Sequence, residues 1–176
     1  MKNVFNIIAN DIRLKAKWNY GSAERSDLIK TIFTDGTAAM ILYRLMQCSR
    51  RLRLSALEML FNKLNTIFCN CIIGRGADFG DGFVLIHSSG IVINGSVRGG
   101  SRIYIEHQVT IGAERHESPR LGSDIFIGAG AKIIGAVQLG DGCRVGANAV
   151  VVEDVPPHAT VVGIPARVVR TQEEAT

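Results

Sequence analysis

The stretch LGSDIFIGAGAKIIGAVQLGDGCRVGANAVV, residues 121–151, carries an aliphatic residue at every sixth position. Counting by six in both directions from Ile133 gives fourteen positions between Ile73 and Val151, and all except Arg115 are apolar. An α-helix repeats every 3.6 residues and a strand every two, so neither element alone produces this period. The spacing predicts a solenoid in which each hexapeptide is one short strand and one turn, three to a coil.

The repeat covers only part of the chain. Residues 1–70 lack it and are expected to form an N-terminal helical region. Four segments in that region have helical composition: 3–18, 26–34, 37–49 and 55–69. Residues 71–170 predict a mainly β solenoid domain, followed by a tail at 171–176. The polar run GAERHESPR at 112–120 cannot fill an apolar interior, so we expect it to leave the coil as an extruded loop.

The balance of basic and acidic residues changes at the same boundary. Residues 1–70 hold eleven Lys and Arg against five Asp and Glu, whereas residues 71–176 hold nine against eleven. A basic helical region fits peripheral contact with an anionic membrane surface as well as an ordinary solvated face. No stretch reaches the roughly 18 uncharged apolar residues of a membrane span, and the N-terminus does not resemble a signal peptide. We expect a cytoplasmic protein without a nucleic-acid partner, and contact with the inner face of the membrane stays open.

Several motifs carry a family resemblance. The hexapeptides and the closing run VPPHATVVGIPARVVR at 155–170 resemble the hexapeptide acyltransferases. IGAGAKIIG at 127–135 is similar to serine O-acetyltransferases, whereas IHSSGIVIN at 86–94 and HQVTIG at 107–112 look closer to the colanic-acid type of exopolysaccharide O-acetyltransferase. The resemblance implies a left-handed parallel β-helix with a small helical cap, acetyl-CoA as co-substrate and a homotrimer.

The resemblance also points to a base. Moving an acetyl group from a thioester to a hydroxyl requires a group that accepts the hydroxyl proton. His87 lies two residues past the Leu85 anchor, where a corner would expose it, and it matches the family's general base. His107, twenty residues further on, is expected to act in catalysis or acceptor binding, and Glu106 is the nearest candidate carboxylate to orient His87.

Three positions depart from the serine acetyltransferase pattern. The aspartate that orients the base in that family falls at Ile72, the acidic residue before the base falls at Ile86, and the loop histidine falls at or next to Ser118. These departures favour a sugar hydroxyl as acceptor, in capsule or exopolysaccharide biosynthesis. Serine O-acetylation in cysteine biosynthesis is the alternative, and a non-catalytic trimeric scaffold is a third interpretation.

The remaining site residues follow from the resemblance. In the extruded loop, His116, Glu117 and Ser118 are expected to contact the acceptor. The family's CoA groove, between subunits of the trimer, implies small residues along the pantetheine arm and cations near the phosphates. These are Gly128, Ala129, Lys132, Arg144, Gly146, Ala147, Arg167 and Arg170. No metal is expected, because no two histidines have the H-x-x-x-x-H spacing of a three-histidine zinc site.

Overall fold

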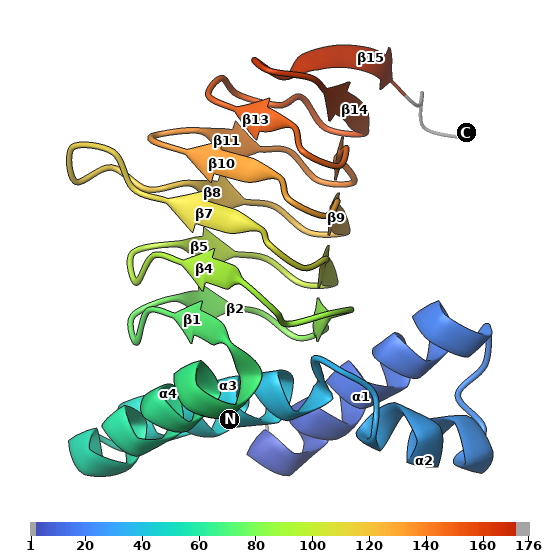
Figure 1. Cartoon of the computed structure of the whole chain (residues 1–176), viewed down its shortest axis with the longest axis vertical. Coiled ribbons are helices and arrows are strands. Elements are labelled where there is room, and N and C mark those ends of the chain that lie inside the picture. The colour runs from blue at the N-terminus through green and yellow to red at the C-terminus, as the bar shows by residue number, and fades with distance from the viewer. Residues whose placement is uncertain (1–2, 172–176) are drawn as a thin grey trace.

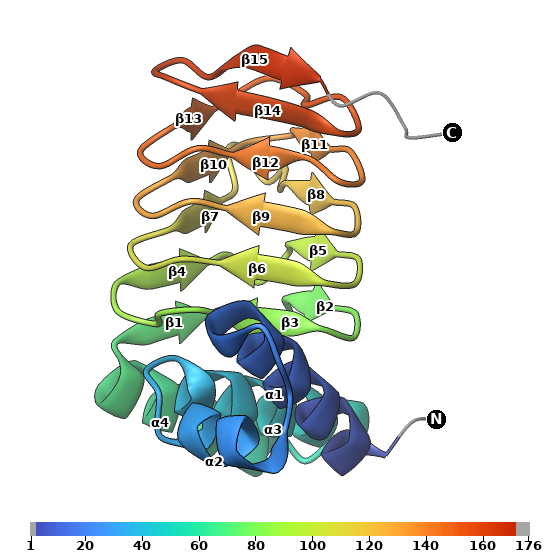
Figure 2. The ribbon, with the colours of Figure 1, turned by 90° about the vertical axis from the view of Figure 1, so that its right-hand side faces the viewer.

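A computed structural model describes residues 3–171, and the expected tail beyond Thr171 lies outside the described residues. The strands wind into a three-sided prism that stands on four helices (Figures 1 and 2). The first sheet contains β1 (Cys71–Ile73), β4 (Ile91–Ile93), β7 (Thr110–Gly112), β10 (Lys132–Ile134) and β13 (Val150–Val151). The second contains β2 (Asp78–Phe79), β5 (Arg98–Gly99), β8 (Arg120–Leu121) and β11 (Gln138–Leu139). The third contains β3 (Phe83–Leu85), β6 (Ile103–Ile105), β9 (Ile125–Ile127), β12 (Arg144–Val145) and β14 (Ala159–Val162), and β15 (Arg167–Thr171) closes it.

The apolar residues that the six-residue spacing selects all point into the prism, where a second residue of several strands joins them. In β1, Cys71 and Ile73 are fully buried, whereas Ile72 between them is 47% exposed. This alternation follows from strand geometry, in which successive side chains point to opposite faces. All strand pairs are parallel except β14 with β15, which turns back antiparallel at the C-terminal end. The predicted mainly β solenoid with an N-terminal helical region is confirmed.

The coils differ in length, which strict spacing by six did not predict. Ile73 pairs with Ile93, twenty residues later, whereas Arg120 pairs with Gln138 after eighteen. The two extra residues of the first coil lie between Leu85 and the next strand. Counting by six does not reveal these two residues, because both Ile91 and Ile93 of β4 point inward. The count reaches Ile91, although the partner of Ile73 is Ile93.

The helices are α1 (Val4–Tyr20), α2 (Arg25–Ile32), α3 (Thr37–Arg51) and α4 (Ser55–Cys69), close to the four predicted segments. The apolar stripe of α4 faces outward: Leu57, Leu60 and Phe68 are 43, 49 and 76% exposed. The buried side of α4 carries Glu58 and Asn65 instead. Among the described residues, none of these helices is long and apolar enough to cross a bilayer.

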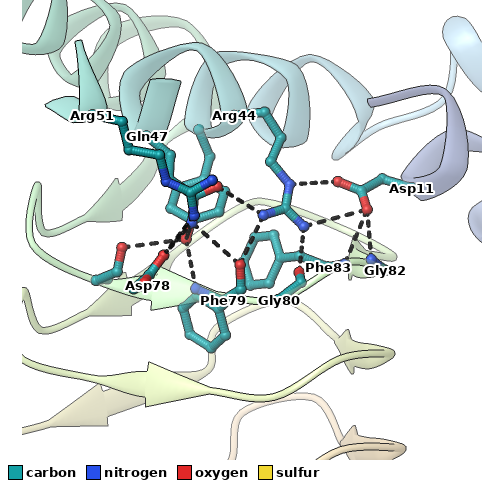
Figure 3. A network of polar contacts seen from close by, with 11 residues as sticks. Asp11, Arg44, Gln47, Arg51, Asp78, Phe79, Gly80, Gly82 and Phe83 are labelled. Atoms are coloured by element: carbon teal, nitrogen blue, oxygen red, sulfur yellow. Dashed lines mark hydrogen bonds and ion pairs between the residues drawn. The ribbon is translucent and has the colours of Figure 1, made fainter. Parts of the chain in front are cut away.

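Buried polar contacts attach the helices to the first coil (Figure 3). Nε of Arg44 on α3 lies 2.6 Å from Oδ2 of Asp11 on α1. The same guanidinium donates to the carbonyl oxygens of Phe79, at 2.9 Å, and Gly80, at 2.6 Å. Asp11 in turn accepts the backbone N–H of Gly82 at 2.8 Å. Because these bonds join α1, α3 and the turn between β2 and β3, they hold the helices in one orientation on the coil.

Candidate active site

The predicted histidines meet at the corner where the third sheet passes into the first. Leu85 and Ile105 are paired residues of β3 and β6, and His87 and His107 each follow two residues later. Their rings lie 5.9 Å apart, centroid to centroid, at 79°. The two side chains are 55 and 45% exposed. We call this edge of the prism the histidine corner; it comprises residues 86–90, 106–108, 128–130 and 146–148.

The carboxylate next to His87 comes from the helical region. Asp35 lies in the loop between α2 and α3, and its Oδ2 is 3.3 Å from Nδ1 of His87. Glu106, predicted to orient His87, lies instead 3.6 Å from Nδ1 of His107. The register explains this correction, because Glu106 stands at the height of Ile86 and is therefore one residue out of step with His87.

The Asp35 carboxylate is held at the end of β3. It accepts hydrogen bonds from the Ser88 hydroxyl at 2.9 Å, the Ser88 N–H at 3.2 Å and the Gly36 N–H at 2.8 Å. Partial burial acts to raise the pKa of Asp35, but the bonds from Ser88, Gly36 and His87 outweigh it and hold the pKa below its usual value. The carboxylate is therefore ionised at neutral pH.

A buried lysine lies behind this loop. Lys15 on α1 is fully buried, and its ammonium group donates to the backbone carbonyl of Asp35. Burial lowers the pKa of Lys15 to about 8, against the opposing attraction of the Asp35 and Glu106 carboxylates. Sequence reasoning missed both Lys15 and Asp35, because neither belongs to the repeat. The one local signal was the Asp35–Gly36 pair between two helical segments, which indicates a turn but names no partner.

The small residues predicted to border CoA continue the histidine corner. Ile127 and Val145 are the next paired residues above Ile105, and Ala129 and Ala147 each follow two residues later. The histidines and the two alanines therefore form one ridge along the prism. Toward its C-terminal end, this ridge presents little side-chain bulk to a ligand.

The glycines of this ridge have a purely structural explanation. A Cβ on Gly128 would lie 2.7 Å from the backbone nitrogen of Ala147, and a Cβ on Gly146 would lie 2.6 Å from Cγ1 of Val162. Stacking of adjacent coils therefore excludes larger residues at both positions. Gly128 and Gly146 are compatible with a cofactor at this edge but are no evidence for one.

The predicted phosphate-binding cations fall into two groups. Lys132 begins β10 on the first sheet and Arg144 begins β12 on the third, so they flank the ridge from either side. Arg167 and Arg170 lie on the closing strand β15 at the end of the prism. Arg167 already pairs with Glu153 at 3.2 Å. The structure therefore places Lys132 and Arg144 beside the ridge and the other two arginines at its end.

The predicted acceptor-binding residues lie at a different corner. Residues 113–119 leave the prism between β7 and β8 as the expected extruded loop (Figure 1). Within it, His116, Glu117 and Ser118 line a cavity of about 360 Å³. This loop joins the first sheet to the second, whereas the histidine corner joins the third to the first. Within one chain, the width of the first sheet separates them.

Comparisons with known proteins agree with this architecture. The family described as bacterial transferase hexapeptide (six repeats) matches residues 118–152. The serine acetyltransferase of Synechococcus elongatus is 32% identical over 170 residues, covering 94% of this chain and 69% of that protein. The chain belongs to the serine acetyltransferase family. A second serine acetyltransferase, from Helicobacter pylori, is 35% identical over 140 residues, covering 76% of this chain and 81% of the relative.

Solved structures of serine acetyltransferases have the same fold. One in complex with CoA superposes with a TM-score of 0.84 at 27% identity, covering 94% of this chain and 69% of that one. The Neisseria gonorrhoeae serine acetyltransferase gives 0.85 at 28% identity, covering 98 and 68%. The resemblance to serine acetyltransferases is confirmed. The expected closeness to colanic-acid enzymes and the expected role in polysaccharide biosynthesis receive no support from these relatives.

Proposed function

We propose that this member of the serine acetyltransferase family transfers the acetyl group of acetyl-CoA to the hydroxyl of serine. Family membership over 94% of the chain is the observation that carries the proposal. The position of Asp35 supports it as well. A missing carboxylate at Ile72 had favoured a sugar acceptor, but the helical region supplies a carboxylate to His87 by another route.

The geometry of His87 suits a general base. With Asp35 facing Nδ1, that nitrogen carries the proton in the neutral ring, and Nε2 is left as the acceptor. Nε2 takes the proton from the serine hydroxyl while the hydroxyl oxygen bonds to the thioester carbonyl carbon. The tetrahedral intermediate then expels the CoA thiolate, which takes the proton back from His87. The products are O-acetylserine and CoA, and no acyl-enzyme forms.

The CoA co-substrate fits along the ridge. Its thioester would lie beside His87 and His107, and its pantetheine arm would run over Ala129 and Ala147. Lys132 and Arg144 lie on either side of this path, where cations can meet the phosphates. We therefore assign Lys132 and Arg144 to the binding of the CoA phosphates. Arg167 and Arg170 are assigned to the end of CoA that lies farthest from the thioester.

We further propose a homotrimer as the active unit. The exposed stripe of α4 continues onto the first sheet, where Ile72 and Val92 are neighbours and are 47 and 40% exposed. An apolar face of this extent favours contact with another chain. Three copies packed around this face allow each extruded loop to approach a neighbour's histidine corner, which it cannot do within its own chain.

Sedimentation velocity tests the assembly. We expect a species of about three times the 19.1 kDa chain mass, and we expect Val92→Glu to shift it toward the monomer with loss of activity. Phe5→Glu is the matched control, because it puts the same charge on an exposed apolar residue of α1, 69% exposed and away from the first sheet. A fully active monomer would refute the trimer.

Release of the CoA thiol tests the reaction. The chain is supplied with acetyl-CoA and either serine or a panel of sugars, and serine is expected to give the faster turnover. His87→Ala is expected to lower kcat/KM by about 10²- to 10⁴-fold. His158→Ala, outside the histidine corner, is expected to leave it unchanged. Turnover of sugars alone would refute the acceptor, and an undiminished rate in His87→Ala would refute the mechanism.

A further inference from the structure

We propose that Asp35 is the positioning residue of His87, so that the helical region supplies part of the catalytic site of the solenoid. This inference rests on the proposed function and deepens it. The family pattern expects such a carboxylate on the solenoid at position 72. There, the described chain has an exposed isoleucine. Asp35 reaches the same imidazole from the loop between α2 and α3.

The loop is shaped for this contact. Gly36 has φ +81°, in the left-handed region, and a Cβ there would lie 2.4 Å from the carbonyl oxygen of Leu85. The backbone of the loop therefore touches the last residue of β3, two residues before His87. Only glycine allows this approach. With the loop held there, the Asp35 carboxylate bonds His87 and Ser88 at the start of the histidine corner.

Ser88 holds the carboxylate of Asp35, and Lys15 holds its backbone. Ser88 is 2% exposed and uses both its hydroxyl and its N–H on Asp35, one on each oxygen. From α1, the Lys15 ammonium donates a hydrogen bond to the Asp35 backbone carbonyl. The serine next to the base and the lysine on α1 thus hold the acid from two sides. Such support is what a residue that orients a catalytic ring requires.

The contact between Asp35 and His87 itself adds little to stability. The Asp35 and His87 side chains are 53 and 55% exposed, so solvent competes for both groups and the contact between them contributes little to folding. The contact does have a catalytic consequence, since a carboxylate at Nδ1 selects the tautomer that leaves Nε2 as the proton acceptor. It also favours the imidazolium that forms when His87 takes the serine proton.

The charged and titratable groups around His87 come from three elements. Asp35 faces its Nδ1, the His107 ring lies at its edge, and Lys15 and Glu106 lie next to these two. Replacing Asp35 by asparagine removes one negative charge from this set and keeps the side-chain shape. The other side chains stay in place, but the pKa of Lys15 should fall further because the Asp35 charge raises it. The effect on His87 is therefore read from the acid limb of the pH profile and from the tautomer of its ring.

Steady-state kinetics of Asp35→Asn are the first test. We expect kcat to fall roughly 10- to 100-fold with the KM for serine and for acetyl-CoA nearly unchanged, as for an interaction that acts in the transition state. The acid limb of the pH profile of kcat/KM is expected to move to lower pH, because the imidazolium loses a nearby negative charge. Asp27→Asn is the matched control. It removes a carboxylate of α2 that bonds Ser22, away from the histidine corner, and should leave kcat and the profile unchanged.

Imidazole NMR gives a readout that does not depend on turnover. The His87 signal, assigned by its loss in His87→Ala, is expected to show the Nδ1–H tautomer in the wild-type chain and a larger Nε2–H share in Asp35→Asn. The inference is overturned if the tautomer, kcat and acid limb all stay as in the wild type. It is also overturned if only the KM for serine rises, which would make Asp35 an acceptor-binding group. If the wild-type chain releases no CoA with any hydroxyl acceptor, the proposed function fails, and the NMR result alone decides the role of Asp35.

Discussion

The solenoid and the helical region are stabilised by different kinds of interior. The inside of the prism is apolar from the first coil to the last. Ten polar or charged residues are buried in the described part of the chain, and nine of them belong to the helices and the loops between them. The tenth is Ser88, which bonds Asp35 of the helical region. Buried polarity therefore gathers in the helices and at their junction with the first coil.

This difference matters for the site. Aliphatic side chains pack without strong directional demands, so a repeated apolar interior specifies a stack of coils more than a particular residue contact. Hydrogen bonds and ion pairs have preferred directions. The network around Arg44 fixes where α1 and α3 sit on the coil, and the loop with Asp35 follows from that placement. The same junction of helices and first coil that buries polar groups also brings Asp35 to the histidine corner.

Arg44→Met removes the buried ion pair at the junction of the helices and the first coil. It leaves the Asp11 carboxylate, which is 1% exposed, without its counter-charge. We expect the free energy of unfolding to drop by about 3–5 kcal/mol, as when one partner of a buried pair is removed. Urea unfolding at neutral pH measures this.

The double variant Arg44→Met, Asp11→Leu is its control. Both charges are then absent, and much of the lost stability should return. A loss below about 1 kcal/mol in the single variant would show that the helices do not depend on this pair.

Lys15 gives the polar junction a pH dependence. In the folded chain it loses its proton near pH 8, whereas in the unfolded chain it keeps it to about 10.4. Between these values unfolding takes up a proton, so rising pH stabilises the folded state through this group. The difference in unfolding free energy between wild type and Lys15→Met should therefore rise from pH 8 to pH 10, by at most about 1.4 kcal/mol per unit.

Urea unfolding of both chains at several pH values checks this. The thiols of Cys71 and Cys143, whose pKa burial raises to about 12, act in the opposite direction, but they are common to both chains and cancel. A difference that is flat or falls with pH would contradict the burial of Lys15 as a charged group at neutral pH.

The fold could be predicted from the sequence because its cause is local and repeated. Each hexapeptide shows its own inward residue, and thirteen of the fourteen positions are apolar, with Arg115 in the extruded loop as the exception. The helices were predictable to within a few residues for a similar reason. The coil lengths were not, since two inward residues such as Ile91 and Ile93 satisfy the same pattern in either register.

The site was predictable only where it lies on the repeat. His87, Ala129 and Ala147 each lie two residues after an anchor of the repeat, whereas His107 was found from its place twenty residues after His87 and from the family resemblance. Asp35 could not be found in this way. Its contact with His87 depends on how the helices pack on the first coil. Arg44 and its partners decide that packing, and such contacts produce no regular spacing that could be read from the sequence.

Ile133→Val tests the apolar side. It removes one methylene from a fully buried residue, and we expect a loss of about 1 kcal/mol. Ile111 pairs with Ile133 on the neighbouring coil, so Ile111→Val should cost nearly the same. Equal losses, measured by urea unfolding, would show that the coils are energetically equivalent. Unequal ones would locate a weak coil.

An exposed ion pair on the solenoid completes the comparison, because it has the same chemistry as the buried pair. Nη2 of Arg102 lies 2.6 Å from Oδ2 of Asp124, and both side chains are 51% exposed. Solvent already hydrates both charges, so Arg102→Met should cost less than about 1 kcal/mol, against several for Arg44→Met. Added salt should reduce the loss at Arg102 more than the loss at Arg44, since buried pairs are screened less. If the two losses were equal, burial would not be what makes the junction of helices and coil depend on its polar contacts.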